Sequence, residues 1–160
     1  MTALKNGKSV DTSLDFTPFE GLVMSTRSGD IDPAIHYYLT KNSDMDIEAV
    51  DNMLNKESGL RGLCEMNDMR EIHEQIAGGN ERARLALEVQ TYRNRRYIGA
   101  YMAVLGRVDA IVFTAGIGEN DKVVREKTLA GDSPVQVWVI PTNEELAIGR
   151  DEKSLLEKEE

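Results

Sequence analysis

A strand, a glycine-rich turn and a helix follow one another directly, and this order constrains the fold more than any other feature of the sequence. Residues 108–114 are rich in branched and aromatic side chains, which favour an extended strand. Residues 115–120, Ala-Gly-Ile-Gly-Glu-Asn, then form the predicted turn, and a helix is expected from about Asp121. Residues 135–140 predict a further strand, followed by another helix. Strands that alternate with helices are typical of an α/β fold.

The rest of the chain predicts a hairpin and three more helices. Asn6-Gly7 between two short extended runs is the pattern of a type I′ hairpin turn. Helices are expected over residues 32–39, where Asp32 precedes a proline, over residues 47–55, and over residues 81–105. Because residues 97–105 are all apolar or small, we expect that half of the longest helix to be buried against a sheet or another subunit.

The composition excludes several classes of protein. A chain of 160 residues can bury a core without disulfides, and its single cysteine, Cys64, is expected to be a buried apolar residue. The net charge of −9 argues against a nucleic-acid partner, and the short basic cluster Arg93, Arg95 and Arg96 is interpreted as a solvated or interface face. No apolar stretch reaches the roughly 18 residues that cross a membrane, and no secretory signal precedes the first elements. A cytoplasmic protein is therefore expected.

The glycine-rich segment is one candidate phosphate site. Gly116 and Gly118 let the backbone approach a ligand closely, and amides at the start of a helix favour an anion. The segment lacks the lysine of a Walker loop and the third glycine of a Rossmann fingerprint. From the residues alone, a nucleotide loop and a plain tight turn are equal alternatives.

Residues 26–33, Thr-Arg-Ser-Gly-Asp-Ile-Asp-Pro, are a second candidate. Arg27 lies there among small polar residues, and a guanidinium can stabilise charge on a transferring phosphoryl group. The alternative is that Arg27 forms an ion pair with Asp30 or Asp32, which orders the loop.

The start of the last predicted helix holds a candidate metal ligand. Thr142 and Glu145 have capping-box spacing, which leaves Glu144 free to face a Mg²⁺ ion through water; an exposed acidic residue without a ligand is the alternative. His36 and His73 have no partners at metal-ligand spacing and are interpreted as surface or packing residues.

Taken together, these segments resemble the C-terminal part of the acetate kinase (acetokinase) family. The matching runs follow the family's order across nearly the whole chain: Val10–Ser13, Phe16–Pro18, Glu20–Leu22, Thr26–Pro33, Glu57–Leu60, Val112–Thr114, Gly116–Asn120 and Pro141–Glu145. The runs at 26–33 and 116–120 are the most specific. Propionate kinases are close relatives with similar motifs in this half.

The resemblance implies a ribonuclease-H-like α/β domain of the superfamily that includes acetate and sugar kinases, Hsp70 and actin. It also implies reversible transfer of the γ-phosphoryl group of ATP to acetate, giving acetyl phosphate and ADP, with Mg²⁺, in a homodimer formed through this domain. Arg27 matches the family arginine that steadies the phosphoryl group, and Glu144 matches the glutamate associated with Mg²⁺. The implied nucleotide-binding residues are Asp68, Met69, Arg70, Gly116, Ile117, Gly118, Glu119 and Asn120, of which 68–70 match by position more than by identity.

The resemblance further predicts that the chain is an incomplete half. Residues 1–160 match the C-terminal nucleotide-binding domain, and the family's N-terminal domain, which holds most of the acyl site, is absent. Family members have a longer stretch before Pro-Thr-Asn-Glu-Glu, so either residues are missing near Gly131–Ser133 or the module is trimmed. We therefore expect the chain to be inactive alone. The alternatives are a non-catalytic nucleotide-binding or dimerisation module, and part of a propionate kinase.

Overall fold

Strands and helices alternate as expected for an α/β fold, and two helices over residues 59–64 and 69–77 were not predicted from the sequence. The computed structural model describes residues 1–129, 131, 134–143, 145–146, 148 and 150. The strands are β1 (Thr2–Lys5), β2 (Lys8–Thr12), β3 (Ala110–Phe113) and β4 (Gln136–Val139). The helices are α1 (Ala34–Asn42), α2 (Ile47–Lys56), α3 (Gly59–Cys64), α4 (Met69–Ala77), α5 (Glu81–Leu105), α6 (Ala115–Asn120) and α7 (Lys122–Thr128).

The described strands form two separate pairs. β1 and β2 are antiparallel, and their turn has positive φ at both Asn6 (54°) and Gly7 (77°), which confirms the predicted hairpin. β3 and β4 are parallel, with Ala110 opposite Gln136 and Phe113 opposite Val139. Their carboxyl ends therefore lie side by side, which is the edge where ligands bind in open parallel sheets.

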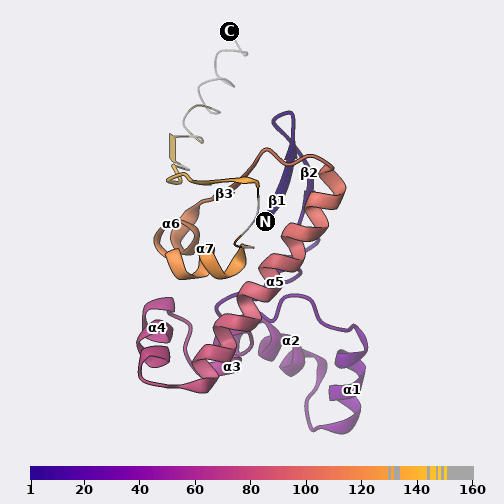
Figure 1. Ribbon diagram of the computed structural model, residues 1–160. Helices are drawn as coiled ribbons and strands as arrows, with labels where there is room; N and C mark the ends of the chain where they lie inside the picture. The colour runs from indigo at the N-terminus through magenta and orange to yellow at the C-terminus, as the bar shows by residue number, and fades with distance from the viewer. Residues whose placement is uncertain (130, 132–133, 144, 147, 149, 151–160) are drawn as a thin grey trace.

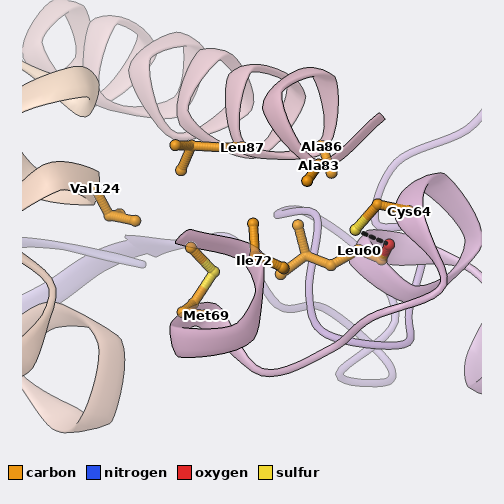
Figure 2. Close-up of a cluster of buried hydrophobic side chains, with 8 residues drawn as sticks. All are labelled: Leu60, Cys64, Met69, Ile72, Ala83, Ala86, Leu87 and Val124. Carbon is orange, nitrogen blue, oxygen red and sulfur yellow. Dashed lines mark hydrogen bonds between the residues drawn. The ribbon is translucent and has the colours of Figure 1, made fainter. Parts of the chain in front are cut away.

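Helix α5 runs diagonally through the molecule and organises the other elements (Figure 1). Helices α3, α4 and α7 pack on it, and strand β1 also contacts it. Ala83 and Ala86 of α5 are completely buried, and their small side chains let the neighbouring helices approach closely. Figure 2 shows the core formed in this way, with the side chains of Leu60, Cys64, Met69, Ile72, Ala83, Ala86, Leu87 and Val124. The expectation that Cys64 is buried is confirmed.

Residues 97–105, expected to be buried against a sheet or another subunit, are mostly exposed within this chain, and their burial against another subunit stays a prediction. Within that half of α5 only Tyr101 is buried, whereas Val104 is 56% exposed. Most of the buried residues of α5 lie in the other half, between Ala83 and Thr91, because side chains of α3, α4 and α7 pack there. Apolar side chains of the parallel strand pair are also uncovered, namely Val112, Val137, Trp138 and Val139.

Candidate functional site

Arg27 lies in the irregular segment between β2 and α1, and the tip of this segment docks on the start of α3. Three backbone hydrogen bonds of 2.9–3.0 Å run from the amides of Ser58, Leu60 and Arg61 to the carbonyls of Thr26, Met24 and Ser25. The first N–H groups of a helix have no partner inside the helix, so these carbonyls satisfy donors that would otherwise be free. The backbone around Arg27 is thereby fixed to a helix start.

Gly59 is required for this docking. Its φ is +61°, and an added Cβ would lie 2.1 Å from the carbonyl oxygen of Met24 and 2.7 Å from that of Arg27. No side chain fits at such distances, and the positive φ is itself unfavourable for other residues. The Glu-Ser-Gly-Leu run at 57–60 therefore helps to hold the backbone around Arg27 in place.

The Arg27 side chain is half-buried and has no acidic partner among the residues that the structure describes. Its Nη1 donates to the carbonyl of Pro18 at 3.4 Å. The expected alternative, an ion pair with Asp30 or Asp32, is wrong. The Asp30 carboxylate accepts a hydrogen bond from Tyr97 at 2.7 Å, and the Asp32 carboxylate accepts one from the Ala34 amide at the start of α1. The guanidinium of Arg27 is therefore available to an anionic ligand.

The glycine-rich segment differs from the predicted turn, because residues 115–120 form the short helix α6. Ala115 begins it with a φ of +59°. An added Cβ at Gly116 would meet nothing within 4 Å, and one at Gly118 would lie 3.4 Å from the backbone of Phe113, an ordinary contact. Packing within the chain therefore does not require glycine at 116, because the space next to its Cα is open.

A compact polar network joins the carboxyl ends of β3 and β4. Glu119 accepts hydrogen bonds from the amide and the hydroxyl of Thr142, at 2.7 and 2.9 Å. The Thr142 hydroxyl also accepts from the Ala115 amide at 2.8 Å and lies 2.5 Å from the hydroxyl of Thr114. The amide and hydroxyl of Thr142 lower the pKa of the Glu119 carboxyl. Two segments predicted separately, 114–120 and 141–145, are thus brought together.

The same network corrects the predicted capping box. The Thr142 hydroxyl is used by α6, and the Asn143 side chain accepts from the Leu146 amide at 3.0 Å, which is the bond of an N-cap. Glu144, the candidate metal ligand, lies outside the described residues. Among the described residues no three His, Cys, Asp or Glu side chains gather as a metal site.

The predicted segment 68–70 begins α4. The Asp68 carboxylate caps the helix through the Arg70 amide at 2.9 Å and also pairs with the Arg70 guanidinium at 2.6 Å. The Met69 side chain is buried in the core, so Asp68 and Arg70 are the members with exposed side chains. The hydrogen bonds from the Arg70 side chain and amide lower the pKa of Asp68 to about 2.

This low pKa gives a prediction. A carboxyl ¹³C NMR titration is expected to show Asp68 titrating at about 2, and Arg70→Ala should move its pKa towards 3.8, the ordinary value. Because the folded-state pKa lies below the unfolded-state value, the contribution to stability is present above about pH 4 and is lost as the pH falls through 2. Arg61→Ala is the control, since it should leave the titration unchanged. Titration of the unaltered protein near 3.8 would contradict the assigned contact.

A contact that the sequence did not reveal joins the two nucleotide-site candidates. His73 of α4 lies 2.7 Å from the carboxylate of Asp121, and the two side chains are 30% and 10% exposed. Asp121 follows α6 directly and caps α7 through the Val124 amide. Helix α4 is therefore fastened to the junction of α6 and α7. In the described part of the chain, no hydrogen bond or ion pair joins Arg27 to either segment.

Comparisons with known proteins agree with this arrangement of motifs. Residues 1–131 match the model of the acetokinase family. The chain is 55% identical, over 182 aligned residues, to the acetate kinase of Desulfotalea psychrophila. Its fold matches the crystal structure of Porphyromonas gingivalis acetate kinase with a TM-score of 0.91 at 38% identity, covering 97% of this chain and 46% of that one. A propionate kinase of Francisella tularensis matches with a TM-score of 0.86 at 40% identity, covering 91% and 44%.

The alignments include nearly all of this chain but less than half of each relative. The Desulfotalea psychrophila alignment includes 98% of this chain and 45% of the relative, so the chain spans less than half of that protein's length. The alignment of 182 residues is also longer than the 160-residue chain, which means that the relative has residues with no counterpart here. In the described part of the chain, no helix is both long and apolar enough to span a membrane.

Proposed function

The chain belongs to the acetokinase family, and on this premise we propose that it is part of an enzyme that transfers the γ-phosphoryl group of ATP reversibly to acetate. The products are acetyl phosphate and ADP. The single observation that carries the proposal beyond family membership is Arg27, whose half-buried guanidinium has no acidic partner among the described residues although its backbone is fixed. A charge held in this way is suited to an anion that binds during the reaction.

The proposed role of Arg27 is to stabilise the phosphoryl group during its transfer. Such transfers require little covalent chemistry from the protein, and catalysis comes from positioning and electrostatic stabilisation. A guanidinium offers parallel N–H donors that match two phosphoryl oxygens. Because the residues just before Arg27 are already bonded to the start of α3, and the Arg27 carbonyl accepts from the Met24 amide, little reorganisation accompanies binding.

The proposed nucleotide site combines α4 with α6. Asp68 and Arg70 present exposed polar groups, and the backbone of Gly116–Asn120 has open space at Gly116. The contact between His73 and Asp121 supports a shared site, because it fastens the two helices together. Bound Mg²⁺ neutralises phosphate charge, and it often binds through one or two carboxylates with the phosphates and water as other ligands. Glu144 is the proposed carboxylate, and Glu119 is occupied by Thr142.

We propose that residues 1–160 are the C-terminal nucleotide-binding portion of this enzyme. Most of the acyl site would then be supplied by an N-terminal portion, which the relatives contain and residues 1–160 do not. The coverage of 45% of the relative and the uncovered apolar strands support this assignment. The chain alone is then inactive. The exposed apolar residues of α5 are the proposed contact with a second copy in a cytoplasmic homodimer. Propionate is the second candidate substrate, because a propionate kinase is among the structural relatives.

The proposal is tested in a hybrid enzyme, in which this chain replaces the matching part of the Desulfotalea psychrophila acetate kinase. Acetyl phosphate made from acetate, ATP and Mg²⁺ is trapped as the hydroxamate and measured. The hybrid enzyme is expected to form it, whereas the chain alone is expected to form none. Hydroxamate formation by the chain alone would contradict the proposed inactivity.

A further inference from the structure

The loop that carries Arg27 is closed at its base by one residue pair. The Asp30 amide donates to the Gly21 carbonyl at 3.1 Å, and the Gly21 amide donates to the Asp30 carboxylate at 2.7 Å. These two bonds join residues 21 and 30 directly, and Arg27 lies in the segment of chain between them. We call residues 21–30 the arginine loop. Asp30 therefore closes the loop with both its backbone and its side chain.

Two side chains of α5 hold this base. Arg93 donates to the Gly21 carbonyl at 2.9 Å and to the Asp30 carbonyl at 3.2 Å, and Tyr97 donates to the second carboxylate oxygen of Asp30 at 2.7 Å. Arg93 and Tyr97 lie one turn apart, so they project from the same face of the helix. The Arg93 side chain is only 18% exposed, so of the two interpretations of the basic cluster, a solvated face or an interface face, the solvated face is wrong for this arginine.

The protonation state of Tyr97 suits this role. Burial, together with the hydrogen bond to Asp30, raises the pKa of Tyr97 to about 12. The hydroxyl therefore keeps its proton and remains a donor at neutral pH. The Asp30 carboxylate receives that donor on one oxygen and the Gly21 amide on the other.

The arginine loop is thus held at two places. Helix α3 binds its tip through three backbone hydrogen bonds, and α5 binds its base through Arg93 and Tyr97. We propose that Asp30, gripped by Arg93 and Tyr97, is a positioning residue that sets the place of the Arg27 guanidinium for phosphoryl transfer. Only the role of Arg27 in this statement rests on the proposed function. Catalytic groups depend on such supporting contacts, because small displacements cost much of the rate.

The first test measures amide hydrogen exchange in this chain. Tyr97→Phe removes the donor to Asp30, and Arg93→Lys replaces a fork that reaches two carbonyls with a single ammonium group. Each substitution should speed exchange of the Asp30 and Met24 amides roughly tenfold, since a hydrogen bond to a charged or closely held group is lost. Exchange of the Leu87 amide in the core should stay unchanged.

Matched controls lie on the same helix. Tyr101→Phe removes a hydroxyl that makes no hydrogen bond to the arginine loop, and Arg96→Lys changes an exposed arginine. Neither control should alter exchange in the loop. The proposal is overturned if Tyr97→Phe and Arg93→Lys leave the loop unchanged, or if they speed loop and core exchange equally, because the effect is then global.

The second test separates positioning from simple stability. In the hybrid enzyme, Tyr97→Phe should lower kcat roughly tenfold with an unchanged KM for ATP, since the proposed nucleotide residues lie on α4 and α6. A loosened loop with an unchanged kcat would overturn the proposal. A hybrid enzyme in which even Arg27→Ala has no effect on kcat counts against the proposed function instead, and the exchange data then decide whether Asp30 anchors the loop.

Discussion

Arg27→Ala in the hybrid enzyme is expected to lower kcat by about 100-fold or more, with a change of less than about threefold in the KM for ATP. The guanidinium is proposed to act on the phosphoryl group as charge redistributes during transfer, so its loss raises the barrier more than it weakens binding of the nucleotide. Arg27→Lys keeps the charge but lacks the planar fork, so an intermediate kcat is expected.

The comparison requires a control that removes a guanidinium without touching the loop. Arg96→Ala serves, because Arg96 is exposed and, in the part of the chain that the structure describes, its side chain makes no hydrogen bond to the arginine loop. Its kcat should equal that of the unsubstituted hybrid enzyme. A raised KM for ATP with an unchanged kcat in Arg27→Ala would refute the proposed role, because Arg27 would then only bind substrate.

Gly59→Ala is expected to have the largest effect on stability, with a loss of about 3 kcal/mol or more in the free energy of unfolding. The new Cβ would lie 2.1 Å from the Met24 carbonyl oxygen, and the residue would keep a φ of +61°. The arginine loop and the start of α3 must therefore separate, which breaks the backbone bonds between them. In the hybrid enzyme kcat should fall as well, because Arg27 moves with the loop.

Gly78→Ala is the matched control for this change. Gly78 follows α4, its φ of −77° suits any residue, and an added Cβ would lie at an ordinary 3.4 Å from the carbonyl oxygen of Gln75. Urea unfolding should give the two variants clearly different midpoints. Equal free energies of unfolding for Gly59→Ala and Gly78→Ala would show that the docking of the loop on α3 is misassigned.

The elements with strong local signals were predictable from the sequence. Helix α5 spans Glu81–Leu105 as expected, since Asn80 caps it and Gly106 ends it. The Asn6-Gly7 turn also has the expected conformation, because few residue pairs adopt two positive φ angles in succession. In both cases residues close in sequence determine the structure.

The misses share one physical cause, which is dependence on distant parts of the chain. The apolar run 97–105 predicts a buried surface, but it does not show whether a sheet of this chain or another subunit covers that surface. His73 and Asp121 are far apart in sequence, and neither has a local pattern that identifies its partner. Thr142 has the spacing of a capping residue, yet the neighbouring helix α6 offers it the Glu119 carboxylate and the Ala115 amide instead.

The candidate site shows the same division. Sequence proximity suggested that Asp30 pairs with Arg27, whereas Asp30 binds α5 through Tyr97 and closes the loop at Gly21. The motif around Arg27 therefore contains both the proposed catalytic group and the residue that anchors it. Which aspartate has which role depends on the position of α5, and the motif alone does not contain that information.

The most direct test of the central claim is acetyl phosphate formation by the hybrid enzyme, measured as hydroxamate with acetate, ATP and Mg²⁺. The account predicts formation that requires this chain and that falls by about 100-fold or more in Arg27→Ala. Hydroxamate formed at the same rate with Arg27→Ala, or formed by the remainder of the hybrid without this chain, would contradict a role for these residues in phosphoryl transfer.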